Sequence, residues 1–158
     1  MAVVLGVALC VSGCKAPAMD DATVRRLVDQ GVDPDYIFRA KIPGFTALET
    51  SAEPMEGGGF RMTYVSDADP AVRAEFQAHR TALTGCPRTP IPRSDGTPTE
   101  CADVAKGWYR SDGRHHEYLH ALQRGSVRLS APTNAISADD LLQTLTRSDS
   151  LWGPASRP

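Results

Sequence analysis

Two cysteines, Cys86 and Cys101, enclose a segment that cannot hold a fold by itself. The segment reads PRTPIPRSDGTPTE and has four prolines and almost no apolar side chain. It can therefore bury too little surface to offset the entropy that is lost when it is ordered. A disulfide that closed this loop of about 15 residues would contribute roughly 3 kcal/mol in the chain-entropy model. The pattern favours a loop that is tied down at its two ends.

The N-terminal residues 2–13, AVVLGVALCVSG, carry no charge and are nearly all apolar or small. This run is too short for a transmembrane helix, which needs about 20 apolar residues, and it has the length of a signal-peptide hydrophobic region. It leads into VSGC, which ends at Cys14 and resembles the bacterial lipobox. The resemblance implies cleavage before Cys14 and a diacylglycerol on its thiol.

The lipobox resemblance implies a protein on the extracytoplasmic face of the cell membrane, held there by its N-terminal lipid. We expect a signal peptide over 1–13 and a polar tether over 14–21. A signal peptide should open with Lys or Arg, but the first positive charge is Lys15, so we expect the true start to lie upstream of Met1. The alternative is a buried N-terminal strand, which the following KAPAMDD does not continue.

The chain has four cysteines. If Cys10 leaves with the signal peptide and Cys14 becomes a thioether, Cys86 and Cys101 remain for an oxidising compartment. We therefore predict a Cys86–Cys101 disulfide, with two free buried thiols as the alternative. A zinc site is less favoured, because neither of these two cysteines has a C-x-x-C or C-x-x-H neighbour.

The rest of the chain is long enough for one domain with one core. We place this domain at 22–147 and a flexible tail at 148–158. The net charge of −2 offers no basic field for nucleic acid. No later segment of the sequence is long and apolar enough to span a membrane.

Residue patterning in the N-terminal half predicts a helix and a hairpin. The helix would begin at Asp21 and stop at Gly31, with Leu27 and Val28 on its apolar face. After it, FTALETSAE and FRMTYVS (60–66) read as two strands around a Gly-Gly-Gly turn. The hairpin would supply the first strands of a sheet.

A second helix is predicted directly after this hairpin. Asp69 and Pro70 have the pattern of a helix start, a carboxylate cap followed by proline in the first turn. Phe76 and Leu83 would lie on the apolar stripe of this helix, and Gly85 would end it. We expect it to be the best-formed element of the chain.

Beyond the proline-rich loop, GWYRSDGRHHEYLHALQRGSVRLSAP has turn signals at 111–113 and 123–125 and an alternating strand at 127–131. A last helix follows, capped by Ser137 with Asp140 three residues on. These elements predict an α+β domain, a small antiparallel sheet of four to five strands with two to three helices packed on one face.

The lipobox, the cysteine pair around a Pro-rich loop and the pattern G-W-Y-R-x-D-G…E-Y…V-R-L-S-A resemble small secreted lipoproteins of high-GC Gram-positive bacteria. This family is largely without known activity, so the resemblance implies a location and a fold. It agrees with a binding or accessory role towards an envelope protein or a cell-wall component. Trp108 and Tyr109 either meet such a partner as exposed aromatics or belong to the core.

Residues 116–120 read HEYLH and match H-E-x-x-H, the signature of zinc metalloproteases. The motif needs a helix, in which residues four apart lie on one face, so that both imidazoles reach one metal and Glu117 serves as general base. In a strand the two histidines would lie about 13 Å apart, at ~3.3 Å per residue. Turn signals on both sides favour the strand, although Asp112 and Gly125 could also bound a helix.

A third metal ligand is hard to find in the sequence. After His120 there is no further His, and after Glu117 there is no further Glu. Asp139 and Asp140 are explained by the start of the last helix. We therefore predict a lipid-anchored binding or accessory module with no catalytic residue and no cofactor. The alternative function is a zinc-dependent hydrolase that uses His116, Glu117 and His120.

Overall fold

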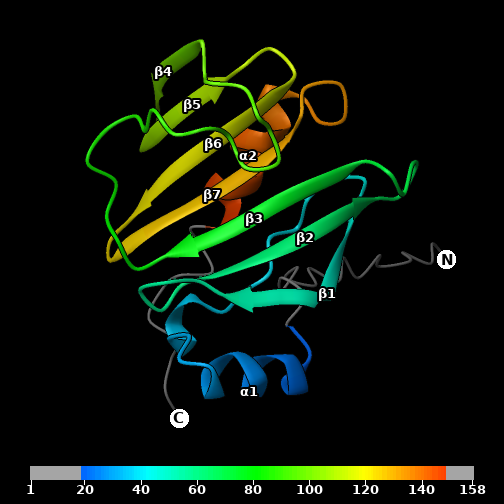
Figure 1. Ribbon diagram of the computed structural model, residues 1–158, viewed down its shortest axis with the longest axis vertical. Helices are drawn as coiled ribbons and strands as arrows, with labels where there is room; N and C mark the ends of the chain where they lie inside the picture. Colours follow the sequence, from blue (N-terminus) through cyan, green and yellow to red (C-terminus); the bar gives the residue numbers. More distant parts are fainter. Residues whose placement is uncertain (1–18, 149–158) are drawn as a thin grey trace, which may run out of the picture.

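The computed structural model describes residues 19–148 of the chain (Figure 1). Residues 1–18, which include Cys14 and the lipobox, and the tail after Ser148 lie outside the described residues. The elements in chain order are α1 (Asp21–Asp29), the short 3-10 helix η1 (Pro34–Tyr36), β1 (Phe45–Pro54), β2 (Phe60–Ser66), β3 (Arg73–His79), β4 (Glu100–Val104), β5 (Gly107–Ser111), β6 (His115–Leu122), β7 (Gly125–Pro132) and α2 (Ala138–Ser148).

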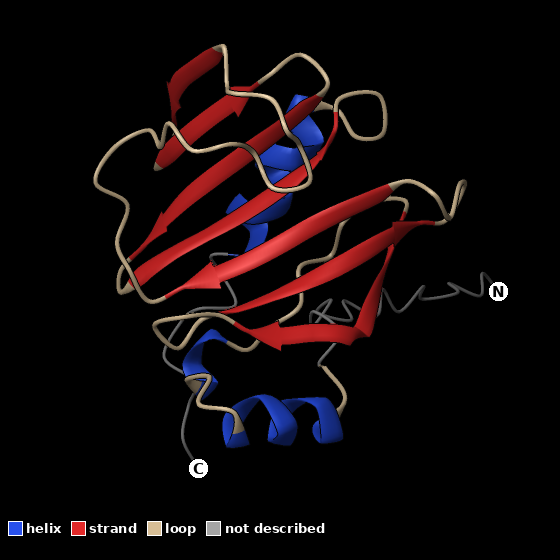
Figure 2. Cartoon of the chain, viewed as in Figure 1, coloured by secondary structure: helices blue, strands red, loops and turns tan. Residues whose placement is uncertain are grey.

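The strands form one antiparallel sheet with the order β1-β2-β3-β7-β6-β5-β4. Two meanders, β1-β2-β3 and β4-β5-β6-β7, join where β3 pairs with β7. Figure 2 shows them as one continuous layer, with β1 and β4 at its edges. This seven-stranded sheet with two α-helices in the described residues corrects the prediction of four to five strands with two to three helices.

The predicted helix from Asp69 to Gly85 is wrong, because its central part, residues 73–79, is strand β3. Asp69 and Pro70 instead form the β-turn between β2 and β3, in which the N–H of Val72 donates to the carbonyl of Asp69 at 3.0 Å. Asp at the first position and Pro at the second are as typical of such a turn as of a helix start. The strand then alternates, with Phe76 fully buried on one face, and pairs on both sides, with β2 and β7.

Other predicted elements are confirmed with small shifts. Helix α1 is capped by Asp20, one residue before the predicted cap, and its side chain accepts from two N–H groups of the first turn. The hairpin of β1 and β2 turns through the three glycines as expected. Helix α2 begins after Ser137, whose Oγ accepts from the N–H of Asp140 at 3.1 Å. Periodic apolar residues with clear caps therefore predicted these elements correctly.

The two faces of the sheet differ in character. One face carries the apolar core and is covered by α2 over β6 and β7 and by α1 near β1, behind and below the sheet in Figure 1. The core side chains from the strands are Ala52, Phe60, Met62, Tyr64, Ala74, Phe76, Ala78, Tyr118, Val127, Leu129 and Ala131. The opposite face is polar, and the proline-rich loop crosses it in front of the strands.

Candidate functional site

The HEYLH sequence lies in strand β6, as the flanking turns predicted. Successive side chains of a strand point to opposite faces. His116 and His120 therefore lie on the core face, whereas Glu117 lies on the polar face. At ~3.3 Å per residue the two histidines are about 13 Å apart along the strand, too far to share one metal ion. The strand separates the three residues that the zinc hydrolase alternative requires.

The two histidines are held in the core by tyrosines. His116 is 2% exposed, and its Nδ1 lies 3.2 Å from the hydroxyl of Tyr109. Burial, together with the nearby His115, lowers the pKa of His116. His120 is fully buried, and its Nδ1 lies 3.0 Å from the hydroxyl of Tyr118. Both rings therefore pack as core residues.

The described part of the chain brings together no group of three or more His, Cys, Asp or Glu side chains that could hold a metal ion. Trp108 and Tyr109 are both half-buried. They are therefore neither freely exposed nor fully buried in the core.

Glu117 stands at the middle of a buried ion-pair cluster, which consists of Arg110, Glu117 and Arg128 on β5, β6 and β7. The side chains of Arg110 and Glu117 are both fully buried. One carboxylate oxygen of Glu117 accepts from Nε of Arg110, and the other accepts from Nε of Arg128 at 2.8 Å. Both carboxylate oxygens are therefore engaged, and Glu117 acts as a counterion within the sheet.

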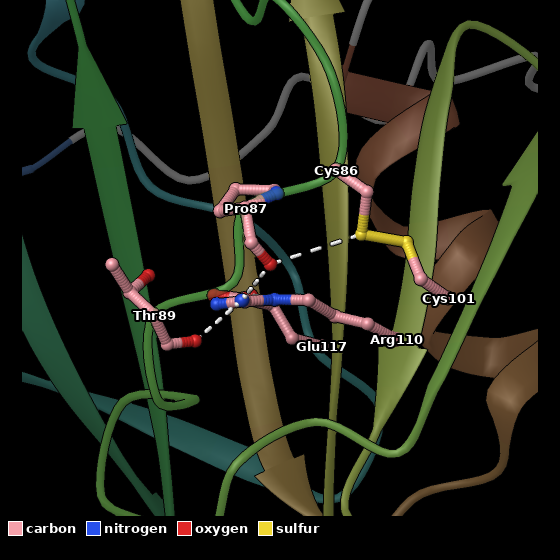
Figure 3. Close-up of a disulfide and its surroundings, with 6 residues drawn as sticks. All are labelled: Cys86, Pro87, Thr89, Cys101, Arg110 and Glu117. Carbon is pink, nitrogen blue, oxygen red and sulfur yellow. Dashed lines mark hydrogen bonds and ion pairs between the residues drawn. A yellow bond between two sulfur atoms is a disulfide. The ribbon is translucent and has the colours of Figure 1, made fainter.

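Arg110 connects this cluster to the proline-rich loop (Figure 3). Its Nη1 donates to the carbonyl oxygens of Pro87 at 2.8 Å and Thr89 at 2.7 Å, and its Nη2 reaches the carbonyl of Pro90 at 3.5 Å. A guanidinium has five N–H donors in a fixed plane. Arg110 directs one of them at Glu117 and most of the others at the loop backbone, so the loop is fixed to the sheet by a buried cation.

The predicted disulfide between Cys86 and Cys101 is confirmed, with the two Cα atoms 6.6 Å apart. Cys101 lies on β4 directly opposite Arg110 on β5. The disulfide thus ties the start of the loop beside the point where Arg110 holds its backbone. The predicted alternative of two free thiols is excluded by this bond.

The loop runs across the strands along one row of paired residues. This row consists of Cys101, Arg110, Glu117, Ser130, Glu75 and Thr63. Further along it, Nε of Arg93 lies 3.6 Å from a carboxylate oxygen of Glu75, and Ile91 is 1% exposed. The loop therefore has an ordered inner side, which the sheet holds, and an outer side that faces solvent.

The middle of the loop is held by the turn between β5 and β6. Ser94 donates from its hydroxyl to a carboxylate oxygen of Asp112. Although burial raises the pKa of Asp112, hydrogen bonds from Ser94 and from the N–H groups of His115 and Arg114 lower it below its usual value. The carboxylate that anchors the middle of the loop therefore stays charged at neutral pH.

Beside the loop, the polar face has a shallow hollow of about 250 Å³ over β1, β2 and β3. Its charges are matched, because Arg61 pairs with Glu53 at 2.6 Å and Arg93 pairs with Glu75. The pairs leave no net charge to attract an ionic ligand. The loop itself is thus the more distinctive feature of this face.

No protein-family model matches the chain, and no curated protein and no solved structure is significantly similar to it. Among residues 19–148, no helix combines the length and apolar character that crossing a bilayer requires. The case for the proline-rich loop as the candidate site therefore depends on the geometry of the loop and of its contacts with the sheet.

Sequence patterns did not identify Arg110 as a buried residue, nor Arg128 as a second partner of Glu117. A signal for the first was present, since the S-D-G turn at 111–113 sets a hairpin register. That register places Arg110 opposite Glu117, and opposite charges at facing positions attract. Nothing in the sequence indicated that the loop would supply carbonyl groups to this arginine.

Proposed function

We propose that the chain is an extracytoplasmic lipoprotein, anchored in the cell membrane by a diacylglycerol on Cys14, and that its domain is a binding or accessory module. Its partner would be a protein or a cell-wall component of the envelope. The disulfide is the structural observation that carries this proposal. A disulfide persists in oxidising compartments and is rare in reducing ones, and here it closes a loop with no core of its own.

On this proposal the connection between anchor and domain would be short. Cys14 is followed by only four residues before Met19, which is already buried. Five extended residues span at most about 18 Å. A lipid on Cys14 would therefore hold the domain close to the membrane surface, as a module that works on partners near that surface.

Phase partitioning in detergent tests the anchor. The protein, expressed in a bacterial host with its full upstream signal, should enter the detergent phase. Cys14→Ser should move it to the aqueous phase, because the lipid is attached through that thiol. Cys10→Ser is the matched control, since it changes the other N-terminal cysteine and should leave partitioning unchanged. A wild-type protein that stays aqueous and begins before Cys14 would contradict the proposal.

A further inference from the structure

We propose that the loop presents Arg88 as a substrate-like ligand to the active site of an arginine-specific serine endopeptidase, and that it resists cleavage there. The inference rests on the proposed binding role and names its partner, but it does not depend on the lipid anchor. Three features support it: prolines restrict the backbone around Arg88, Arg110 holds that backbone, and the side chain of Arg88 is exposed.

Proline shapes the backbone on both sides of Arg88. In the sequence CPRTPIP (86–92), Pro87 precedes the Arg-Thr pair, and Pro90 and Pro92 follow it. A residue before proline avoids the helical region, and proline fixes its own φ near −65°. These limits favour an extended backbone for most of the segment. All of its peptide bonds are trans, so the segment resembles the extended form in which endopeptidases bind substrates.

The side of the segment that faces the sheet is hydrogen-bonded to Arg110. The carbonyl oxygens of Pro87 and Thr89 converge on one nitrogen of Arg110, at 2.8 and 2.7 Å. Because the carbonyls of both residues that flank Arg88 point to the same nitrogen atom of Arg110, the backbone between them curves away from the sheet. Arg88 therefore lies at the outermost point of this curve.

Arg88 itself is left free for a partner. Its side chain is exposed, and across residues 19–148 it forms no ion pair, nor does its main chain form a hydrogen bond. The pocket of a trypsin-type endopeptidase holds a carboxylate that binds such a cation. Pro90 has no N–H to donate, so the contacts of the loop with the enzyme would be concentrated at Arg88 and the residues before it.

The support behind the loop is rigid. Arg110 is completely buried and is fixed by Glu117 on the neighbouring strand. The disulfide of Cys86 lies two residues before Arg88. A ligand that already has its bound conformation loses little entropy on association. The loop is therefore organised for binding before the enzyme arrives.

The same support opposes cleavage. Attack by the serine Oγ on the Arg88 carbonyl carbon would form an acyl-enzyme and release the Thr89 nitrogen as an amine, after which water would hydrolyse the ester. The released amine cannot leave, because Arg110 holds the Thr89 carbonyl and the Cys86–Cys101 disulfide joins the two chain segments. It stays beside the ester and reforms the peptide bond in competition with water.

Inhibition of trypsin by the purified, oxidised full chain in detergent tests this inference. Hydrolysis of a small arginine substrate should fall as the chain is added, and Arg88→Ala should weaken inhibition at least 100-fold. Arg25→Ala, which changes an exposed arginine of α1 outside the loop, is the control and should inhibit like the wild type. Chymotrypsin, which has an apolar pocket, should be inhibited only by Arg88→Leu.

Reduction provides the second measurement. Reduced protein should be cut rapidly after Arg88, whereas oxidised protein should stay largely intact over the same period, as mass spectrometry would show. Rapid cleavage of the oxidised chain, absence of inhibition, or inhibition that survives Arg88→Ala would each overturn the inference. Detergent partitioning does not depend on Arg88, so the proposal of a lipid anchor and the proposal of an inhibitory loop are tested separately.

Discussion

Replacing Arg110 with methionine tests the central feature of the polar face. The substitution keeps a long apolar stem but removes the charge that Glu117 and the loop carbonyls share. Breaking a buried ion pair by removing one partner costs about 3–5 kcal/mol. Glu117 keeps Arg128, whose side chain is 17% exposed, so we expect the lower end, about 3 kcal/mol. Such a loss is a large share of the stability of a small domain.

The assay is urea denaturation of the oxidised protein, followed by far-UV circular dichroism. Arg61→Met is the matched control, because Arg61 also pairs with a glutamate on this face but its side chain is 49% exposed, and exposed pairs contribute at most about 1 kcal/mol. Glu117→Gln should also destabilise the domain. The double variant Arg110→Met/Glu117→Gln should cost less than the sum of the two, by about 0.5–3 kcal/mol.

A loss below about 1 kcal/mol for Arg110→Met would refute the reasoning, since that is the range of surface substitutions. Strict additivity in the double variant would also refute it. In that case Glu117 would not depend on Arg110 for its burial.

Three further predictions concern other parts of the domain. Alkylation under native conditions should modify neither Cys86 nor Cys101, and reduction should lower the free energy of unfolding by about 3 kcal/mol. Burial, with Arg128 nearby, lowers the pKa of His79 to about 4, against 6.5 when unfolded. As the pH falls, His79 therefore becomes protonated in the unfolded chain before it does so in the folded one. The free energy of unfolding should be constant above pH 7 and fall by about 1–2 kcal/mol between pH 7 and pH 5. The variant His79→Gln should flatten this slope. Dialysed protein should contain well under one zinc per chain, and Glu117→Gln should leave any measured hydrolytic activity unchanged; stoichiometric zinc with hydrolysis abolished by that variant would reinstate the hydrolase.

The sequence predicted elements whose apolar side chains are large and regularly spaced. Strand β2 alternates Phe60, Met62 and Tyr64 on the core face, and its period of two is unambiguous. In β3 the core positions beside Phe76 are Ala74 and Ala78. Alanine favours helices and gives little periodic signal, so pairing with neighbours on both sides decided the structure there.

Other features depended on contacts distant in sequence. Strand β4 has mostly exposed residues and pairs only with β5, so no apolar alternation marks it. The burial of Arg110 depends on carbonyl groups more than 20 residues away, which local patterns cannot reveal. The disulfide was accessible to prediction because cysteine number and loop composition left few alternatives.

The joining of the two meanders at β3 and β7 has a consequence for how the chain folds as it is synthesised from its N-terminus. Ser126 on β7, the partner of His79 on β3, emerges 47 residues later. Until then the N-terminal meander would have β3 as an open edge, which can pair with another chain. During synthesis, aggregation should therefore depend on the delay before β7 arrives, and a chaperone that shields residues 73–79 should matter most in that interval.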